Sequence, residues 1–364
     1  MNYALSPPDK WFTTTPQPLF DSWWKTLKAL RPLNNALGID LGTSNTLIYS
    51  HIEGVVLNEA SIIAINQLTQ TPVSVGNTAR QLLGRTSTPV AVLRPVRNGV
   101  IADLKLTQIM LQSFIRKAQQ GTRIFRPRLV LGCSCGATSV EREALTEAAL
   151  EAGARDVVLI DEPIAAALGI GLPITKPKGN LIIDIGGGTT EMAVICSSHV
   201  IDSQVISIAG DSFNQAIVDY LRQTFQVHIG ELTAESLKIQ FGSASDSACN
   251  DTPMEILGVN VGSGLPQRLE INSGELRDAI SIPLHKISVA LLNFLERTHP
   301  ELVSDIAERG IMVTGGGALL SGIDTFFQDL THLPVHISPN PLNSVVLGTG
   351  KILEYEHQSS YSFA

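Results

Sequence analysis

Two short turns in this sequence combine glycines, hydroxyl side chains and a preceding aspartate, which suits binding of a phosphate group. The first lies in GIDLGTSNTLIY, at residues 38–49, and the second in IIDIGGGTTEMAV, at residues 182–194. Glycines let backbone N–H groups close around an anion, and hydroxyls add further donors. We therefore predict that both turns bind phosphate. The residues concerned are Gly42, Thr43, Ser44 and Asn45 in the first turn, and Gly186, Gly187, Gly188 and Thr189 in the second.

An aspartate ends the strand before each of these turns. Asp40 precedes the first turn and Asp184 precedes the second. Carboxylate oxygens suit hydrated Mg²⁺, which commonly binds beside phosphates. The alternative is that each aspartate only caps its own turn. The matching position of the two aspartates favours the metal site.

Two further segments carry groups that a nucleotide enzyme needs. In TGGGALL, the backbone amides of Gly315, Gly316 and Gly317 can approach an adenosine or its α-phosphate, although an ordinary turn has the same pattern. In DEPIAAA, Asp161 and Glu162 end a predicted strand, where a carboxylate can orient the water that attacks the γ-phosphorus. The alternative is that this acidic pair caps the following helix. No segment matches the Walker pattern G-x-x-x-x-G-K-[ST].

Strand-like and helix-like blocks alternate after residue 35, which predicts an α/β architecture. The predicted strands are residues 36–40, 47–50, 129–133, 157–160, 181–184, 191–196 and 311–314. The predicted helices are residues 106–119, 140–152, 163–168, 213–224, 234–242, 274–296 and 322–329. Because the two phosphate turns have the same form, we predict a duplicated domain, with the nucleotide between the halves.

Composition limits the class of protein. The 364 residues are 44% hydrophobic and 16% charged, which fits two folded halves. The net charge of -8 and the absence of a basic run argue against binding of nucleic acid. The four cysteines lack the CxxC spacing of a zinc site and are expected to be free thiols. No apolar run approaches the roughly 20 residues of a membrane span, and no signal peptide is visible, so we expect a cytoplasmic protein.

The first 35 residues differ in composition from the remainder. A Pro-, Thr- and Ser-rich arm precedes residues 19–33, which are predicted to form an amphipathic helix. Its apolar side includes two tryptophans, a residue type that favours the membrane interface. We predict that this helix binds the membrane surface through Phe20, Trp23, Trp24 and Leu27. The alternative is that it packs on its own domain or on a neighbouring subunit.

The segments DLGTSNT, DEPIAAA, DIGGGTTE and TGGGALL, in this order, resemble the phosphate-1, hinge, phosphate-2 and adenosine motifs of the actin, Hsp70 and sugar-kinase superfamily. Within it, VVLNEASIIAI, LRPVRNGVIAD and ERGIMVTGGGALLSGID are similar to the MreB family, and the resemblance covers about residues 37–354. One departure is CSCGAT where that family usually has VPVGAT, so that Ser134 and Cys135 replace proline and valine.

The resemblance implies an α/β actin-like (ribonuclease H-like) fold of duplicated domains with a nucleotide cleft between them. Its implied parts are a flexible arm at 1–35, domain I at 36–180 with subdomain IB at about 67–101, domain II at 181–345 with subdomain IIB at about 215–273, and a segment at 346–364 that returns to domain I.

The resemblance also implies roles for residues. Asp40 and Asp184 would organise Mg²⁺, and Glu162 would be the catalytic residue that positions the hydrolytic water. The adenosine would lie against the third glycine cluster, with Glu235 and Lys238 beside it.

The activity implied by the resemblance is weak ATP hydrolysis that controls filaments on the inner face of the cytoplasmic membrane. Such filaments organise peptidoglycan synthesis during wall elongation and maintain cell shape, with RodZ, MreC and MreD as partners. The alternative is a monomeric ATPase or a kinase of the same fold, which would need an acceptor pocket in the cleft.

Overall fold

The computed structural model describes residues 36–119, 126–245 and 253–360, with side chains as far as residue 354. The predicted membrane-binding helix, including Phe20, Trp23, Trp24 and Leu27, lies outside these ranges.

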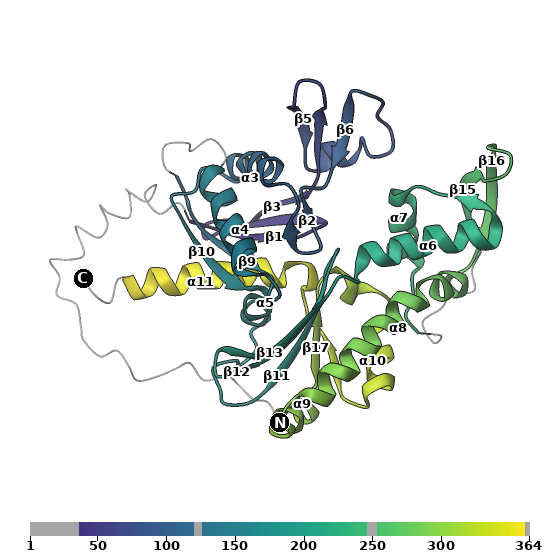
Figure 1. The fold of residues 1–364 in the computed structure, drawn as a ribbon. Helices are drawn as coiled ribbons and strands as arrows, with labels where there is room; N and C mark the ends of the chain where they lie inside the picture. The colour runs from purple at the N-terminus through teal and green to yellow at the C-terminus, as the bar shows by residue number, and fades with distance from the viewer. Residues whose placement is uncertain (1–35, 120–125, 246–252, 361–364) are drawn as a thin grey trace, which may run out of the picture. The chain divides into compact units, whose positions relative to one another are not determined.

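Two five-stranded sheets with the same topology form the framework (Figure 1). The first has the order β10-β9-β1-β2-β3 and the second β13-β12-β11-β17-β18. In each, three consecutive strands are antiparallel and two later strands add in parallel. This repetition confirms the predicted α/β duplication. The strand bounds are β1 Ala36–Leu41, β2 Asn45–Ser50, β3 Gly54–Ala60, β9 Arg128–Cys133, β10 Asp156–Asp161, β11 Asn180–Ile185, β12 Thr190–Cys196, β13 His199–Ile206, β17 Ile311–Thr314 and β18 Val335–Ile337.

Smaller sheets are added to each half. Their orders are β5-β4-β6 and β7-β8 in the first half, and β14-β15-β16 in the second. The bounds are β4 Ile63–Asn66, β5 Thr71–Val75, β6 Val90–Leu93, β7 Val96–Arg97, β8 Val100–Ile101, β14 Val227–His228, β15 Met254–Asn260 and β16 Pro266–Ile271.

Helices follow or precede most of these strands, as the predicted alternation requires. Their bounds are α2 Asn77–Arg80, α3 Leu104–Ala118, α4 Ser139–Glu151, α5 Glu162–Ile170, α6 Gly210–Phe225, α7 Glu231–Phe241, α8 Ser273–Arg297, α9 Pro300–Arg309, α10 Ile323–Thr331 and α11 Ser344–Ser360, with 3-10 turns η3 Gly316–Leu319 and η4 Pro341–Asn343.

Helix α8 is, among the described residues, one helix that is long and apolar enough to cross a membrane by length and composition alone. Half of the most apolar stretch of this helix is buried inside the protein. Ile280, Leu284 and Leu291 are among its buried side chains, and they belong to the core of the second half. Because this face is packed, α8 behaves as a core helix.

Helix α11 packs against α5, β1 and β9, so this last described helix lies on the first sheet (Figure 1). The sequence did not predict this helix, because Gly348 and Gly350 lower helix propensity. It also did not predict α9, a short helix that begins at Pro300. The division into numbered domains and subdomains stays a prediction.

Candidate functional site

The two glycine turns face one another across a cleft. The turn after β1 and the turn after β11 approach so closely that a Cβ atom on Gly187 would lie 2.1 Å from the Ser44 hydroxyl oxygen. A Cβ on Gly188 would lie 2.7 Å from Thr43 Oγ1. Only glycine therefore fits at these two positions without a shift of the opposing turn.

A cavity of about 400 Å³ opens between these turns, which is within the usual size of small-molecule sites. Every residue predicted to bind nucleotide, metal or the hydrolytic water lines it, although their roles stay predictions. They are Asp40, Gly42, Thr43, Ser44, Asn45, Glu162, Asp184, Gly186, Gly187, Gly188, Thr189, Glu235, Lys238, Gly315, Gly316 and Gly317.

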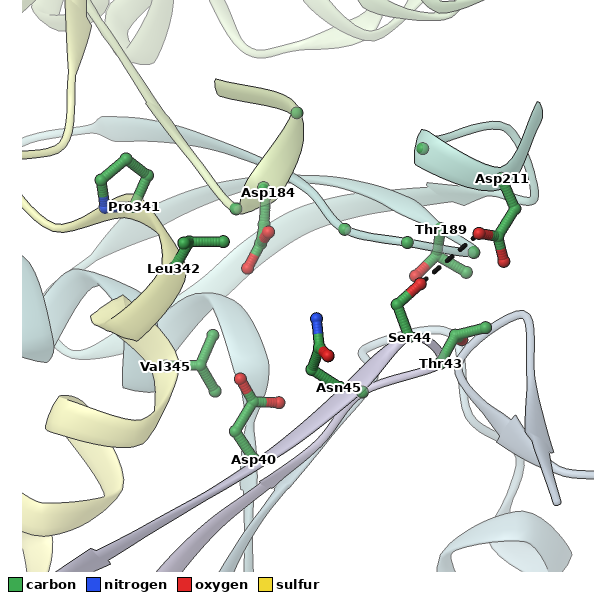
Figure 2. A pocket seen from close by; sticks show the side chains of 18 of the residues that line it. Asp40, Thr43, Ser44, Asn45, Asp184, Thr189, Asp211, Pro341, Leu342 and Val345 are labelled. Atoms are coloured by element: carbon green, nitrogen blue, oxygen red, sulfur yellow. Dashed lines mark hydrogen bonds between the residues drawn. The ribbon is translucent and has the colours of Figure 1, made fainter. Parts of the chain in front are cut away.

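Figure 2 shows how the walls of this cavity differ in chemistry. Asp40 and Asp184 extend into the cavity from the two sheets, while Pro341, Leu342 and Val345 form an apolar wall at one side. At the other side, the Ser44 hydroxyl donates to Asp211 Oδ1 at 3.4 Å. A ligand with a flat apolar part would match the wall formed by Pro341, Leu342 and Val345.

The carboxylates at the floor of the cavity are poorly solvated. Burial, with a smaller effect of Glu191, raises the pKa of Asp40 to about 7. Burial, followed by the charges of Asp40 and Glu191, raises the pKa of Asp184 to about 8. Burial and the same neighbours hold the pKa of Glu162 well above its usual range. A cation placed among these groups would relieve their mutual repulsion.

The donor set suits Mg²⁺. Among the described residues, no group of three or more histidine, cysteine, aspartate or glutamate side chains could hold a metal by itself. Mg²⁺ usually takes only one or two carboxylates and fills its other positions with water and phosphate oxygens. Asp40 and Asp184, with glycine turns beside them that can hold phosphate, meet that requirement.

Glu162 is the first residue of α5, at the end of β10. The residue before it, Asp161, occupies the N-cap position but makes no capping hydrogen bond with its side chain. Instead it accepts a hydrogen bond from Arg142 at 2.6 Å. Asp161 therefore stands at the N-cap position without capping through its side chain, whereas Glu162 lies in the first turn of α5, where its charge favours the helix.

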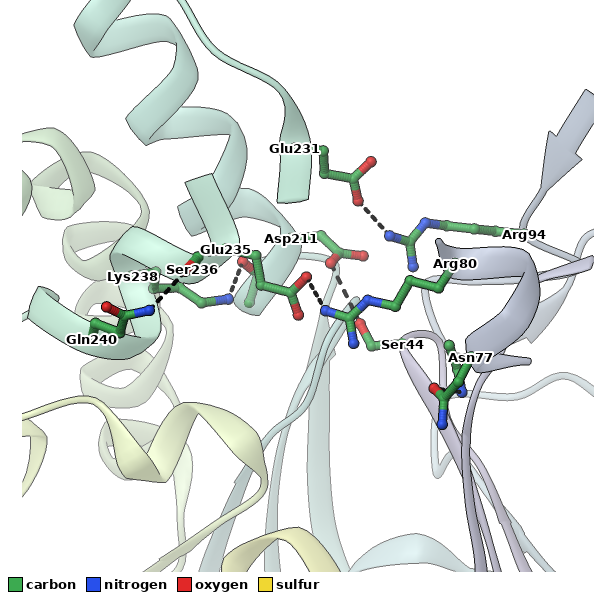
Figure 3. Close-up of polar contacts among 12 residues, drawn as sticks. Ser44, Asn77, Arg80, Arg94, Asp211, Glu231, Glu235, Ser236, Lys238 and Gln240 are labelled. Carbon is green, nitrogen blue, oxygen red and sulfur yellow. Dashed lines mark hydrogen bonds and ion pairs between the residues drawn. The ribbon is translucent and has the colours of Figure 1, made fainter. Parts of the chain in front are cut away.

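The mouth of the cavity is bridged by polar contacts between the two halves (Figure 3). Arg80, which ends α2, pairs with Glu235 of α7. Arg94, after β6, pairs with Glu231 at the start of α7. Within the second half, Lys238 donates to the backbone oxygen of Gly210 at 2.9 Å. Glu235 and Lys238 thus line the cavity and also have protein partners.

The sequence of the whole described region matches one protein family. The model of the MreB/Mbl protein family matches residues 34–361. The chain belongs to the MreB/Mbl family. Its curated relatives include the cell shape-determining protein MreB of Escherichia coli, which is 44% identical over 334 residues, covering 90% of this chain and 96% of the relative.

Solved structures of the MreB/Mbl family share this architecture. MreB5 of Spiroplasma citri bound to ADP superposes with a TM-score of 0.85 and 38% identity, covering 92% of this chain and all of that one. The same protein bound to AMPPNP gives a TM-score of 0.83, covering 90% of this chain and 97% of that one. The predicted actin-like fold is thereby confirmed.

Several residues of the site in this MreB/Mbl chain were not predicted to belong to it. Val345 and Leu342 reach the cavity from α11 and η4, which the glycine-rich sequence obscured. Arg80 and Arg94 lie in segments without a chemical motif, so no local signal marked them. Glu191 lies two residues after Thr189, the last residue of the second phosphate turn, and that position was a usable signal.

Proposed function

We propose that the protein binds ATP in the cavity between its two halves. The single observation that carries this proposal is that both glycine turns, both aspartates and the third glycine cluster line one cavity of about 400 Å³. The match to a family member bound to ADP and to AMPPNP supports the same ligand. Pro341, Leu342 and Val345 would contact the base, and the glycine turns would surround the phosphates.

Asp40 and Asp184 would hold Mg²⁺ largely through water, and when bound this ion neutralises charge on the phosphates. The hydroxyl groups of Thr43 and Thr189 and the backbone amides of the turns donate to phosphate oxygens. Glu162 accepts a hydrogen bond from the water that attacks the γ-phosphorus, which fixes the direction of attack. With these roles, the protein would hydrolyse ATP slowly.

Hydrolysis would control assembly of the protein with itself into filaments. Bound ATP contacts both halves and so favours a closed cleft, and loss of the γ-phosphate removes part of that bridge. We place these filaments on the inner face of the cytoplasmic membrane, attached by residues 19–33. They would organise peptidoglycan synthesis with RodZ, MreC and MreD and maintain cell shape, the role named for the Escherichia coli relative.

Sedimentation with and without liposomes tests this function, and each condition is run with ATP–Mg²⁺, with ADP and without nucleotide. The full chain is compared with a chain that starts at Asn35 and with a full chain in which Trp23 and Trp24 are alanine. We expect ATP-dependent pelleting of all three without lipid, and lipid binding by the unchanged full chain only. Protein that stays monomeric at high concentration with ATP and lipid contradicts filament formation and favours a monomeric ATPase or kinase.

A further inference from the structure

Glu191 is a buried carboxylate at the cavity wall whose two oxygen atoms have different surroundings. It lies on β12 opposite Asp184 in the register of β11 and β12, with 3% of its surface exposed. Oε2 accepts a hydrogen bond from the backbone N–H of Cys135 at 3.4 Å. The Ser134 hydroxyl also donates to this carboxylate. Oε1 has no hydrogen-bond partner within the part of the chain that the structure describes.

An unpaired buried acceptor destabilises the fold, and it does so more strongly when the group carries a charge. Native proteins rarely keep such an atom unless water, an ion or a ligand completes its hydrogen bonds. Glu191 lines the same cavity as Asp40, Asp184 and Glu162. Oε1 itself is buried, so a molecule in the cavity becomes its partner only after a change in the side-chain torsion angles of Glu191.

Glu191 and Glu162 reach the same place from opposite halves. A Cβ atom on Gly132 would lie 3.2 Å from Glu162 Cγ, so Glu162 passes beside the end of β9. The turn that holds Glu191 Oε2, at Ser134 and Cys135, begins directly after that strand. Both carboxylates thus stand next to residues 132–135.

Arg142 contacts residues next to both Glu162 and Glu191. Arg142 of α4 donates to Asp161 Oδ1 at 2.6 Å and to the backbone oxygen of Ser134 at 3.4 Å. Asp161 precedes Glu162, and Ser134 contacts Glu191. Arg142 therefore connects the residue before Glu162 with the turn that contacts Glu191.

We propose that Glu191 is a second catalytic carboxylate, which holds the attacking water together with Glu162 while Oε2 accepts from the backbone N–H of Cys135 and the Ser134 hydroxyl contacts the same carboxylate. This inference rests on the proposed ATP hydrolysis. Two acceptors on different sides of one water fix both O–H bonds, so that a lone pair of the water points at the γ-phosphorus.

The water oxygen forms the new bond to the γ-phosphorus. The bond from that phosphorus to the oxygen bridging to the β-phosphate breaks, and its electron pair stays on ADP. One proton of the water passes to the carboxylate that accepts it and from there to the phosphate released.

Ser134 is the part of this arrangement that the family resemblance does not supply. The family usually has proline at this position, which carries no hydroxyl. In this chain the hydroxyl contacts Glu191 and also accepts from the N–H of Gly136 at 3.2 Å. Ser134 is thus a positioning residue for Glu191.

The experiment measures single-turnover hydrolysis of ATP–Mg²⁺ by the full chain, by Glu191→Gln and by Ser134→Ala. Glutamine keeps an oxygen that can accept from Cys135, but its NH₂ group cannot accept a hydrogen bond from water. We expect hydrolysis by Glu191→Gln to fall by about 10²-fold, the lower end of what a positioned proton acceptor contributes. For Ser134→Ala we expect a fall of about threefold to tenfold, as for loss of one hydrogen bond.

Three further measurements distinguish a catalytic role of Glu191 from a role in folding. They are the affinity for AMPPNP, the thermal midpoint of unfolding and AMPPNP-dependent pelleting. We expect all three to equal the wild-type values in Glu191→Gln, as in the control Glu270→Gln, an exposed glutamate on β16. Wild-type hydrolysis by Glu191→Gln, or affinity and stability that fall together with the rate, overturns the inference. Ser134→Ala retains Glu191, so an unchanged rate in that variant overturns the positioning role. A wild-type chain that binds ATP without hydrolysing it, or does not bind it, contradicts the proposed function itself.

Discussion

Arg80 and Glu235 form an ion pair across the mouth of the cavity, with 2.5 Å between a guanidinium nitrogen and a carboxylate oxygen. Arg80 ends α2 in the first half, and Glu235 lies on α7 in the second. Arg94 and Glu231 make a second pair between the same two regions (Figure 3). Because the two halves cannot separate at α7 without breaking these contacts, the pairs favour the closed cleft.

Reversal of one charge should speed release of the nucleotide. Arg80→Glu places a carboxylate against Glu235, and partly exposed pairs of this kind contribute about 0.2–1 kcal/mol. We expect release of a fluorescent ATP analogue, followed by stopped flow, to become about two- to fivefold faster. The double variant Arg80→Glu with Glu235→Arg should recover part of that loss, because the attraction is restored with the opposite polarity.

The exposed pair of Arg268 and Glu255 on the β15–β16 hairpin gives a matched control. Arg268→Glu reverses a charge outside the cavity and should leave the release rate unchanged. Higher salt should speed release from the wild-type protein, because it screens partly exposed pairs. Equal release rates for Arg80→Glu and wild type at low salt would show that the pairs do not hold the cleft closed.

A methyl group at Gly187 should block the approach of the two phosphate turns. The Cβ atom of alanine at this position would lie 2.1 Å from Ser44 Oγ, so one turn must move. We expect Gly187→Ala to weaken binding of ATP by about tenfold or more, equivalent to at least about 1.4 kcal/mol. Calorimetric titration measures this, with Gly262→Ala in an exposed loop as the control. Unchanged affinity for Gly187→Ala would mean that the turns can separate and still bind.

The sequence predicted the chemical groups of the site better than the elements that complete it. Asp40, Asp184 and the glycine turns were recognised because their spacing is local and their residue types are restricted by phosphate chemistry. The apolar wall at Leu342 and Val345 was not recognised. Its residues are chemically ordinary, and only the return of α11 to the first sheet brings them to the cavity.

The same limit applies to the contacts between the halves. The Arg80–Glu235 and Arg94–Glu231 pairs join residues 155 and 137 positions apart. No local pattern in the sequence distinguishes these two arginines from the other arginines of the chain. The duplicated topology, in contrast, was predictable, because each half repeats the same strand–turn–strand pattern within about a dozen residues.

Stability without nucleotide should depend on pH through Asp184. Burial raises the pKa of Asp184 from 3.8 to about 8, so the folded state holds a proton that the unfolded state has lost at neutral pH. This difference in pKa stabilises the folded state most at a pH below 3.8, the pKa of the unfolded state. The stabilisation is lost as the pH rises toward about 8, the pKa of the folded state. We expect the thermal midpoint of the nucleotide-free protein to fall as the pH rises from 6 to 8, because Asp184 loses its proton. The fall should be smaller in Asp184→Asn, which cannot lose a proton at this position.

Asp329→Asn is the matched control, because Asp329 is an exposed aspartate on α10. Its pH profile should follow that of the wild type. Parallel profiles for wild type and Asp184→Asn would contradict the assigned cause. Addition of Mg²⁺ with ADP should flatten the wild-type profile, because a bound cation favours the charged carboxylate.

The contact of α11 with α5 depends on the absence of a side chain at Gly348. A Cβ atom there would lie 1.7 Å from the backbone oxygen of Ala165, and backbone atoms cannot move aside as a flexible side chain can. We expect Gly348→Ala to lower the free energy of unfolding by about 2 kcal/mol, since overpacking outweighs the higher helix propensity of alanine. Urea denaturation measures this, with Gly262→Ala expected to match wild type. Because α5 begins at Glu162, the same substitution should also slow hydrolysis of ATP. A stable Gly348→Ala with normal hydrolysis would show that α11 can shift along α5 without moving Glu162.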